Sequence, residues 1–310
     1  MTHQELREEI LRLKKEKNAL IMAHYYQRDE IQEIADFIGD SLALARQAAK
    51  TDADIIVMCG VHFMGETAKI LCPGKKVLVP DMAAGCSLAD SCDADDFRRF
   101  VEAHPGYTVI SYVNTSAAVK ALTDIVVTSG NARKIVESLP ADEKIIFGPD
   151  KNLGGYINSV ASRDMLLWQG ACHVHDRFSI DKIMDLKKEH PEAKILVHPE
   201  CRRPLQLIAD KVGSTAALLE FAEKDEAPEY IVVTESGILF EMRRKCSSKR
   251  FIPAPAEDSE CQCNECDYMK LNTLEKVYAA LRDEAPEIHV DPEVAAKAIR
   301  PIERMLELSV

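Results

Sequence analysis

Short runs of consecutive apolar residues recur along the chain at regular intervals. Residues 19–24 (ALIMAH), 107–112 (YTVISY) and 194–198 (KILVH) are rich in apolar, β-branched or aromatic side chains, which is typical of buried β-strands. A segment with helical periodicity precedes each of them, as in residues 2–17, where apolar side chains recur every three or four positions. The pattern predicts strands alternating with helices, and therefore parallel sheets with functional loops at the carboxyl ends of the strands.

A pair of polar residues marks the end of each of these strands. The pairs share a spacing of two residues and are His24 with Tyr26, Tyr112 with Asn114, and His198 with Glu200. A hydroxyl follows the first member of each pair by 17 residues, at Ser41, Ser129 and Thr215. Each hydroxyl opens a helical run, where an N-cap is expected and where free backbone amides attract anions. The three copies start 88 and 86 residues apart, which indicates an internal threefold repeat.

Every copy continues with two further apolar runs, and the last run leads to a cysteine. These cysteines are Cys86, Cys172 and, in the third copy, one of Cys261, Cys263 or Cys266. We predict an α/β fold of three pseudo-threefold-related α/β repeats, each with a short parallel sheet flanked by helices, around a central active site. The predicted units are residues 1–104 with the N-terminal helix, 105–190, and 191–310 with the C-terminal helices.

The second copy departs from the pattern after its second apolar run. Residues 148–155 (GPDKNLGG) contain three glycines and a proline. Because these residues interrupt regular structure, we predict a loop over the site at this point.

Composition narrows the classes of function. The 310 residues carry 39 Lys and Arg against 51 Asp and Glu, a net charge of −12, which argues against nucleic acid or a membrane surface as the main partner. No apolar run approaches the roughly 20 residues needed to span a bilayer. Ten cysteines at irregular spacing, in a chain without a recognisable signal peptide, indicate a reducing, cytoplasmic setting and metal binding instead of disulfides.

Three thiolates from three units could hold three irons of a [4Fe-4S] cluster and leave the fourth iron without a protein ligand. An iron with an open position is a Lewis acid suited to dehydration or condensation chemistry. Zinc is the competing metal, because it also accepts cysteine ligands and leaves a catalytic position open. In the third unit the run CQCNEC at residues 261–266 leaves the ligand undecided, and it could also form a self-contained metal loop with Cys246.

The hydroxyls and the polar pairs are suited to two different tasks, anion binding and proton transfer. The three hydroxyls at helix starts suit carboxylate or phosphate groups, while His, Tyr and Glu can move protons. Glu200, beside a metal and a histidine, is suited to act as a general base, and Tyr26 as an acid or proton relay. His175, three residues after Cys172, is either a further group of the site or part of the ligand shell.

Several segments of the chain are similar to one known family. They include AHYYQ at residues 23–27, CGVHFMGETAKIL, PDMAAGCSLADSC, SYVNTSAAVKA, PDKNLG, GACHVH, HPEC, TESG, CDYMKLNTLEK and the tail HVDPEVAAKAIRPIERML. In this order, and across all three repeats, they resemble the quinolinate synthase family over essentially the full length. The resemblance implies condensation of iminoaspartate (iminosuccinate) with dihydroxyacetone phosphate to quinolinate, phosphate and water in NAD biosynthesis, with an oxygen-sensitive [4Fe-4S] cluster. It also implies a functional link to the enzyme that produces iminoaspartate.

The resemblance further implies roles for individual residues. The cluster ligands are Cys86, Cys172 and Cys266, the last because it directly precedes the run DYMKLN. Substrate contacts carry over to His24, Ser41, Tyr112, Asn114, Ser129, His198, Glu200 and Thr215, and Tyr26 carries over to proton transfer. Some members have CxxCxxC near the third ligand, whereas this chain has CxCxxC, so no redox role carries over to Cys261 and Cys263.

Two other hypotheses use the same residues. An iron-sulfur hydro-lyase acting on a hydroxy acid would also need an open iron, but it would have no use for dihydroxyacetone phosphate. A metal-containing metabolite sensor would need a partner surface or a DNA-binding element, and the sequence contains neither a basic helix nor an appended domain.

Overall fold

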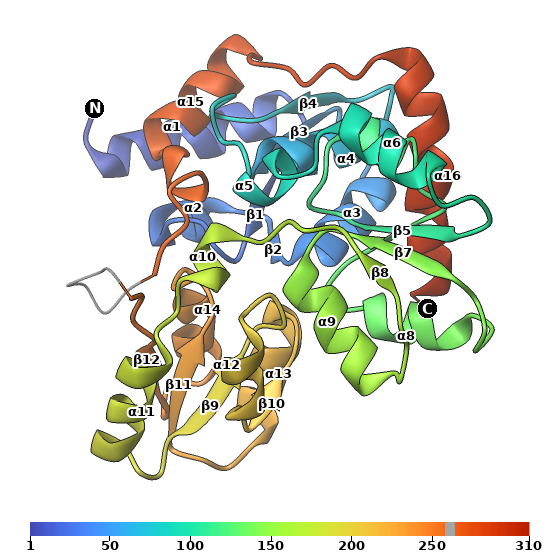
Figure 1. Ribbon diagram of the computed structural model, residues 1–310. Helices are drawn as coiled ribbons and strands as arrows, with labels where there is room; N and C mark the ends of the chain where they lie inside the picture. Colours follow the sequence, from blue (N-terminus) through green and yellow to red (C-terminus); the bar gives the residue numbers. More distant parts are fainter. Residues whose placement is uncertain (258–263, 310) are drawn as a thin grey trace.

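The computed structural model describes residues 1–257 and 264–309. It contains three four-stranded sheets in which every pair of neighbouring strands is parallel (Figure 1). The predicted α/β fold of three repeats, each with a short parallel sheet flanked by helices, is confirmed. Cys261 and Cys263, two of the three candidates for the third ligand, lie outside the described residues.

The first sheet has the strand order β2-β1-β3-β4. Its part of the chain contains α1 (His3–Glu16), β1 (Ala19–His24), α2 (Asp29–Ile34), β2 (Phe37–Gly39), α3 (Ser41–Lys50), β3 (Ile55–Cys59), α4 (His62–Leu71), β4 (Lys76–Leu78), α5 (Ser87–Asp90) and α6 (Ala94–Glu102). The Thr2 hydroxyl caps α1, and the Glu5 side chain bonds back to the Thr2 amide, which fixes where the helix begins.

The second sheet repeats this order as β6-β5-β7-β8. Its elements are β5 (Thr108–Tyr112), α7 (Ala117–Lys120), β6 (Ile125–Val127), α8 (Ala132–Ser138), β7 (Ile145–Gly148), α9 (Lys151–Val160), β8 (Leu166–Leu167) and α10 (His173–Asp176). The loop predicted for residues 148–155 is wrong, because α9 begins at Lys151. The Asp150 carboxylate caps this helix by accepting from the amides of Asn152 and Leu153, and this cap outweighs the helix-breaking tendency of the glycines.

The third sheet has the order β10-β9-β11-β12. Its elements are α11 (Ile180–Glu189), β9 (Lys194–Val197), α12 (Arg203–Leu207), β10 (Lys211–Val212), α13 (Thr215–Lys224), β11 (Glu229–Val233), α14 (Ile238–Lys245) and β12 (Arg250–Pro253). The chain then continues with the 3-10 turn η1 (Met269–Leu271), α15 (Leu274–Asp283) and α16 (Pro292–Leu308).

One strand of each sheet was not predicted. These strands, β2, β6 and β10, are two or three residues long and lie at one edge of their sheets. Each pairs with the central strand that ends in the polar pair, as Ile110–Tyr112 of β5 pairs with Ile125–Val127 of β6. Each edge strand leads directly to the segment that carries Ser41, Ser129 or Thr215. The edge strands therefore bring those hydroxyls to the carboxyl ends of the sheets.

Apolar packing joins the three sheets to one another. The largest buried apolar cluster contains side chains from all of them, among them Met22, Ile110 and Tyr230. The helices after the third sheet return to the first two. Helix α15 packs on α1 and β3 (Figure 1). Helix α16 packs on β6, α7 and α4.

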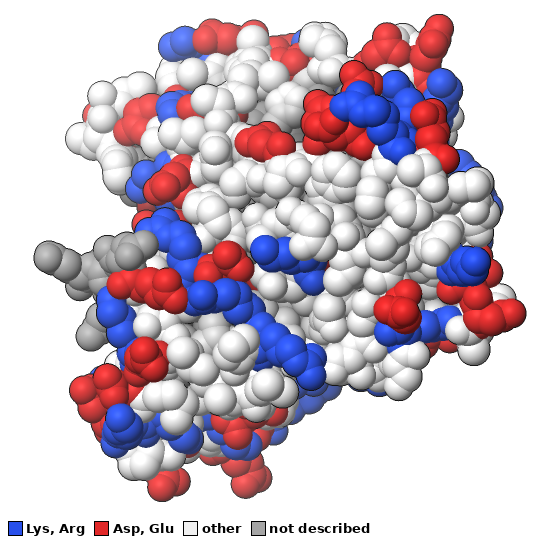
Figure 2. All heavy atoms as spheres, in the orientation of Figure 1, with Lys and Arg blue, Asp and Glu red and all other residues white. Residues whose placement is uncertain are grey.

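The surface carries its charge in small groups. On the face shown in Figure 2, basic and acidic side chains lie beside one another, with a broad uncharged area between the groups. Several groups are ion pairs one helical turn apart, such as Arg12 with Glu16 and Arg133 with Glu137, both at 2.7 Å. Among the described residues, no helix combines the length and the apolar character that crossing a membrane requires.

Candidate active site

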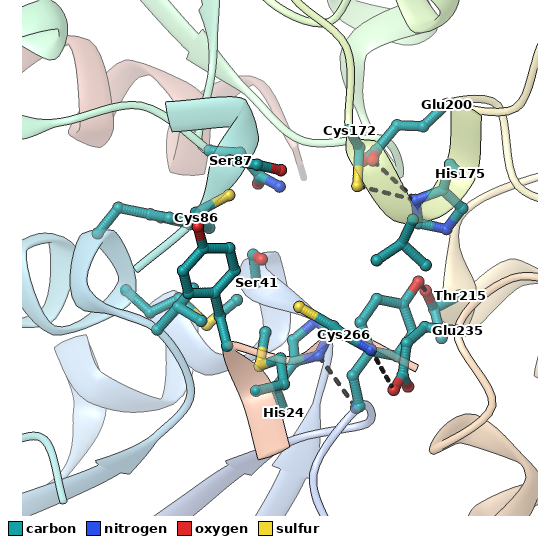
Figure 3. Close-up of a pocket in the computed structure, with 18 of the residues that line it drawn as sticks. His24, Ser41, Cys86, Ser87, Cys172, His175, Glu200, Thr215, Glu235 and Cys266 are labelled. Carbon is teal, nitrogen blue, oxygen red and sulfur yellow. Dashed lines mark hydrogen bonds and ion pairs between the residues drawn. The ribbon is translucent and has the colours of Figure 1, made fainter. Parts of the chain in front are cut away.

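The carboxyl ends of the three sheets face one pocket (Figure 3). All twelve residues predicted for the site line it: His24, Tyr26, Ser41, Cys86, Tyr112, Asn114, Ser129, Cys172, His198, Glu200, Thr215 and Cys266. The pocket contains about 690 Å³ of space, counting its opening to solvent, which is a usual size for a small-molecule site. Because parallel strands end at the same edge of a sheet, the threefold repeat converts equal spacing along the chain into proximity in space.

The two strand-end histidines have the same local geometry. The ring nitrogen Nδ1 of His24 accepts from the amide of Tyr26 at 3.2 Å, and Nδ1 of His198 accepts from the amide of Glu200 at 3.4 Å. A neutral imidazole whose Nδ1 accepts carries its proton on Nε2. Burial lowers the pKa of both histidines to about 3. Both are therefore neutral near pH 7, and each has an Nε2 proton available to donate to a ligand.

Glu200 is the acidic centre of the strand-end groups. Its Oε1 accepts from the Tyr112 hydroxyl at 2.5 Å, and its Oε2 lies 3.0 Å from Nδ1 of His175. Burial alone would raise the pKa of Glu200, but the interactions with His175, His198 and the Tyr112 hydroxyl outweigh burial and lower the pKa to about 2. The carboxylate is therefore ionised and hydrogen-bonded on both oxygens.

Tyr26 belongs to a chain of hydroxyls. Its phenol oxygen lies 2.8 Å from Oγ1 of Thr215 and 2.7 Å from Oγ1 of Thr234, and Thr234 lies 2.9 Å from Nε2 of His175. Burial raises the pKa of Tyr26 well above its usual value, so the phenol keeps its proton. Hydrogen bonds thus run without interruption from Tyr26 through Thr234 and His175 to Glu200.

The predicted role of Ser41, Ser129 and Thr215 as helix caps is wrong. The caps of α3 and α13 are the preceding residues, Asp40 and Ser214, whose side chains accept from the amides of Ala43 and Ala217. The cap position of α8 is Asn131, which makes no side-chain cap bond. Because Asp40 and Ser214 cap their helices, Ser41 and Thr215 are not needed as caps. They line the pocket instead, as Ser129 does.

Asn114 and Ser129 complete the polar wall contributed by the second sheet. Asn114 presents an oxygen, Oδ1, that is buried and has no hydrogen-bond partner among the described residues. Ser129 lies beside the Tyr112 hydroxyl and helps to hold the pKa of that tyrosine down, although burial and Glu200 raise it overall. A buried acceptor without a partner is costly, so Asn114 is suited to receive a donor from a ligand.

Three thiols, each on the segment that follows the last strand of a sheet (β4, β8 or β12), enter the same pocket. Burial raises the pKa of Cys86 to about 12 and that of Cys266 to about 11, and it raises the pKa of Cys172 well above its usual value. All three cysteines line the pocket, and Figure 3 shows their sulfurs around a common space. Three thiols from separate loops are the donor set of a [4Fe-4S] cluster with one open iron, and the described residues fit that group.

Buried carboxylates hold two of the three cysteine loops, and the sequence interpretation missed both. Oδ2 of Asp150 accepts from the amide of Cys172 at 3.0 Å, and Oε1 of Glu235 accepts from the amide of Cys266 at 3.1 Å. Both side chains are fully buried. Burial and Glu200 raise the pKa of Asp150 to about 8 against its three amide donors, and burial raises the pKa of Glu235.

Asp150 and Glu235 occupy equivalent places, two residues after β7 and β11. Comparing the three repeats position by position would have found them. In the first repeat the corresponding position is Val61, which has no carboxylate, and there the amide of His62 donates to the carbonyl of Ala84 at 2.7 Å. Cys86 is therefore held differently from the other two cysteines.

A second missed set lies next to the cysteines and connects their loops. The hydroxyl of Ser87 lies 2.5 Å from Nδ1 of His173, and the ring of His173 meets the ring of Tyr268 edge to face at 5.9 Å. These residues follow Cys86, Cys172 and Cys266 by one or two positions. His175, whose role was left open, lines the pocket with its Nδ1 3.4 Å from the Cys172 sulfur.

Comparison with known proteins gives one consistent result. A model of the family described as "Quinolinate synthetase A protein" matches residues 8–307. A protein named quinolinate synthase from Chloroherpeton thalassium is 54% identical over 305 residues, which cover 98% of this chain and 95% of that protein. Another of the same name, from Microcystis aeruginosa, is 56% identical over 300 residues, covering 97% and 94%. The chain therefore belongs to the quinolinate synthetase A family.

Proposed function

We propose that this enzyme condenses iminoaspartate with dihydroxyacetone phosphate to form quinolinate, phosphate and water, a step of NAD biosynthesis. The observation that carries the proposal is that three thiols and the strand-end polar groups of all three sheets line one pocket. The names of the relatives and the family resemblance supply the identity of the product and the substrates. Thiols that must stay reduced favour the cytoplasm as the compartment.

Cys86, Cys172 and Cys266 are the residues that would hold a [4Fe-4S] cluster. When bound, the cluster supplies a Lewis-acidic iron that has no protein ligand. The carboxylates of Asp150 and Glu235 fix the backbone at two of these cysteines, so buried hydrogen bonds hold the segments that carry these two thiols.

The strand-end groups bind and orient the substrates. His24 and His198 present Nε2 protons to substrate oxygens, and neutral donors suit carboxylates in a buried site because they bring no extra charge. The hydroxyls of Ser41, Ser129 and Thr215 bind the remaining oxygens near the starts of α3, α8 and α13, where backbone amides favour anions. Asn114 accepts a donor such as a substrate hydroxyl or imine.

Protons move through Glu200 and Tyr26. The ionised Glu200 takes a proton from a carbon next to a carbonyl or imine, as condensation requires. Tyr26 keeps its proton near pH 7 and donates it to a departing hydroxyl. The hydrogen-bonded chain through Thr234 and His175 connects the two residues. A proton taken up by Glu200 can therefore pass along this chain to Tyr26 between steps.

The proposal is tested by purifying the chain without oxygen, measuring iron and sulfide, and assaying quinolinate from freshly generated iminoaspartate and dihydroxyacetone phosphate. About four irons per chain together with quinolinate formation support it. The same cluster without quinolinate would favour a hydro-lyase or a sensor. Zinc in place of iron would contradict the cluster.

Single substitutions refine the test. Cys86→Ala, Cys172→Ala and Cys266→Ala should each abolish the intact cluster, whereas Cys261→Ala and Cys263→Ala, the matched controls from the same chain, should retain it. Loss of the cluster in Cys261→Ala would mean that Cys261, and not Cys266, is the third ligand. Glu200→Gln should keep the cluster and lose most turnover, and unchanged kinetics would remove Glu200 from proton transfer.

A further inference from the structure

One corner of the pocket contains a second possible set of metal ligands. The Cys172 sulfur, Nδ1 of His175 and a carboxylate oxygen of Glu200 all lie within 4.8 Å of one another. Nδ1 of His175 is 3.0 Å from Oε2 of Glu200 and 3.4 Å from the Cys172 sulfur. These groups come from the second and third units, and Figure 3 shows them turned toward one another.

The two separations from Nδ1 of His175 are close to those around a single tetrahedral ion. Zinc bonds of about 2.0–2.3 Å to oxygen, nitrogen and sulfur place tetrahedral donors roughly 3.3–3.7 Å apart. The observed separations from Nδ1 differ from that range by a few tenths of an ångström, so small side-chain rotations would suffice. One thiolate, one imidazole and one carboxylate suit Zn²⁺, Fe²⁺ or Co²⁺, whereas Mg²⁺ and Ca²⁺ prefer oxygen ligands alone.

Each of the three ligand residues is itself held by a further hydrogen bond. Nε2 of His175 bonds to Oγ1 of Thr234 at 2.9 Å, which leaves Nδ1 for the metal. The second oxygen of Glu200 accepts from Tyr112 at 2.5 Å, and the Cys172 amide donates to Asp150 at 3.0 Å. Such outer contacts orient ligands at metal sites and raise their affinity.

Buried charge gives the same set a reason to bind a cation. Glu200 and His175 are buried and Cys172 is partly buried, and a buried carboxylate is stabilised by a positive charge placed next to it. A divalent ion would displace the thiol proton and any proton on Nδ1 and would bond to all three groups.

We propose that the cluster-free chain binds one divalent transition-metal ion, Zn²⁺ or Fe²⁺, through Cys172, His175 and Glu200, with a fourth position open to the pocket. This mononuclear site stands independently of the proposed reaction. One consequence rests on the proposed function: because both modes use Cys172, the single ion and the [4Fe-4S] cluster exclude each other.

Co²⁺ is the probe for the test, because tetrahedral Co²⁺ with a thiolate ligand has characteristic visible and charge-transfer absorption. Full-length, metal-free chain is titrated without oxygen, and one equivalent should bind. Cys172→Ala and His175→Gln should bind more than tenfold more weakly, and the thiolate band should vanish in Cys172→Ala. Cys86→Ala and Cys266→Ala are matched controls from the same pocket and should bind as the wild type does.

Thr234→Val provides a second variant that leaves all three ligand atoms in place. It removes the hydrogen bond to Nε2 of His175, and removal of such an outer contact weakens metal binding roughly 10–100-fold. It serves in place of His175→Gln if that variant loses its near-ultraviolet circular dichroism. Absence of Co²⁺ binding, equal loss in Cys86→Ala or Cys266→Ala, or unchanged affinity in both His175→Gln and Thr234→Val would overturn the site.

Competition between the single metal ion and the [4Fe-4S] cluster is measured in a separate experiment. Chain loaded with one Zn²⁺ should take up no iron or sulfide during anaerobic reconstitution until a chelator removes the zinc. A cluster that assembles while zinc stays bound would overturn mutual exclusion. Failure of zinc-free chain to take up iron would count against the proposed function and leave the mononuclear site to the Co²⁺ titration.

Discussion

The strand-end groups and the cysteine loops share one pocket but are held in place differently. His24 and His198 are fixed by amides only two residues away along the chain. Cys172 and Cys266 are fixed by carboxylates 22 and 31 residues away. The first set is therefore determined by the strand that carries it, whereas the second depends on how neighbouring strands assemble into a sheet.

The largest expected effect comes from breaking a cysteine loop at its carboxylate. Asp150→Ala leaves three amides without their acceptor, those of Asn152, Leu153 and Cys172. A buried donor without a partner costs roughly 1–3 kcal/mol, so the free energy of unfolding should fall by about 3 kcal/mol or more. Urea denaturation of the cluster-free chain measures it, with the exposed Asp142→Ala as control. A loss below about 1 kcal/mol would show that water replaces the carboxylate.

The buried strand-end histidines should make the free energy of unfolding depend on pH. Burial lowers the pKa of His24 to about 3, from 6.5, so the unfolded chain binds the proton first as the pH falls. The stability contribution is complete above pH 6.5 and is lost progressively as the pH falls toward 3. Between pH 6.5 and 5 the wild type should lose about 2 kcal/mol more than His24→Gln. Parallel stability curves for the two proteins would contradict this.

Glu235→Gln should have a smaller effect than removal of Asp150. The amide has one acceptor oxygen, so it can serve either Gly237 or Cys266 but not both as the carboxylate does. A loss of about 1–2 kcal/mol in unfolding free energy is expected. Glu265→Gln, on the exposed neighbouring segment, provides the matched control. Equal stability of both variants would mean that the Cys266 loop does not depend on the carboxylate.

The smallest effect concerns binding by a single hydroxyl. Ser129→Ala should weaken the apparent affinity for the anionic substrates by about 1 kcal/mol or more if the hydroxyl bonds a charged group. The exposed Ser247→Ala should leave affinity unchanged. Equal kinetics in both variants would mean that the Ser129 hydroxyl does not bind the substrates.

The sequence predicted those parts of the molecule that repeat with a simple spacing. Apolar runs identified the central strands. Equal offsets identified the nine strand-end and hydroxyl residues together with Cys86 and Cys172, whereas Cys266 was selected only by the family resemblance. The edge strands were missed because two or three residues are too few to show a pattern, as in Lys211–Val212.

The helix caps depend on which of two adjacent polar residues accepts the hydrogen bond from the first turn of the helix. At the start of α3 both Asp40 and Ser41 are good caps, and only the observed bond from Ala43 to Asp40 decides between them. Asp150 and Glu235 were missed because their partners are distant in sequence. Without an explicit alignment of the repeats, an acidic residue after a strand gives no sign that it holds a cysteine loop.

The position of Ser309 at the end of α16 matters for protein engineering. Its carbonyl accepts from Arg46, and its hydroxyl accepts from Asn131, whose own side chain holds the amide of Thr128 beside Ser129. A fusion partner or surface linkage attached just after residue 309 would therefore disturb the hydrogen bonds that hold the Thr128–Ser129 segment of the pocket. Attachment ahead of α1, where Thr2 is exposed, is the safer choice for immobilising the enzyme.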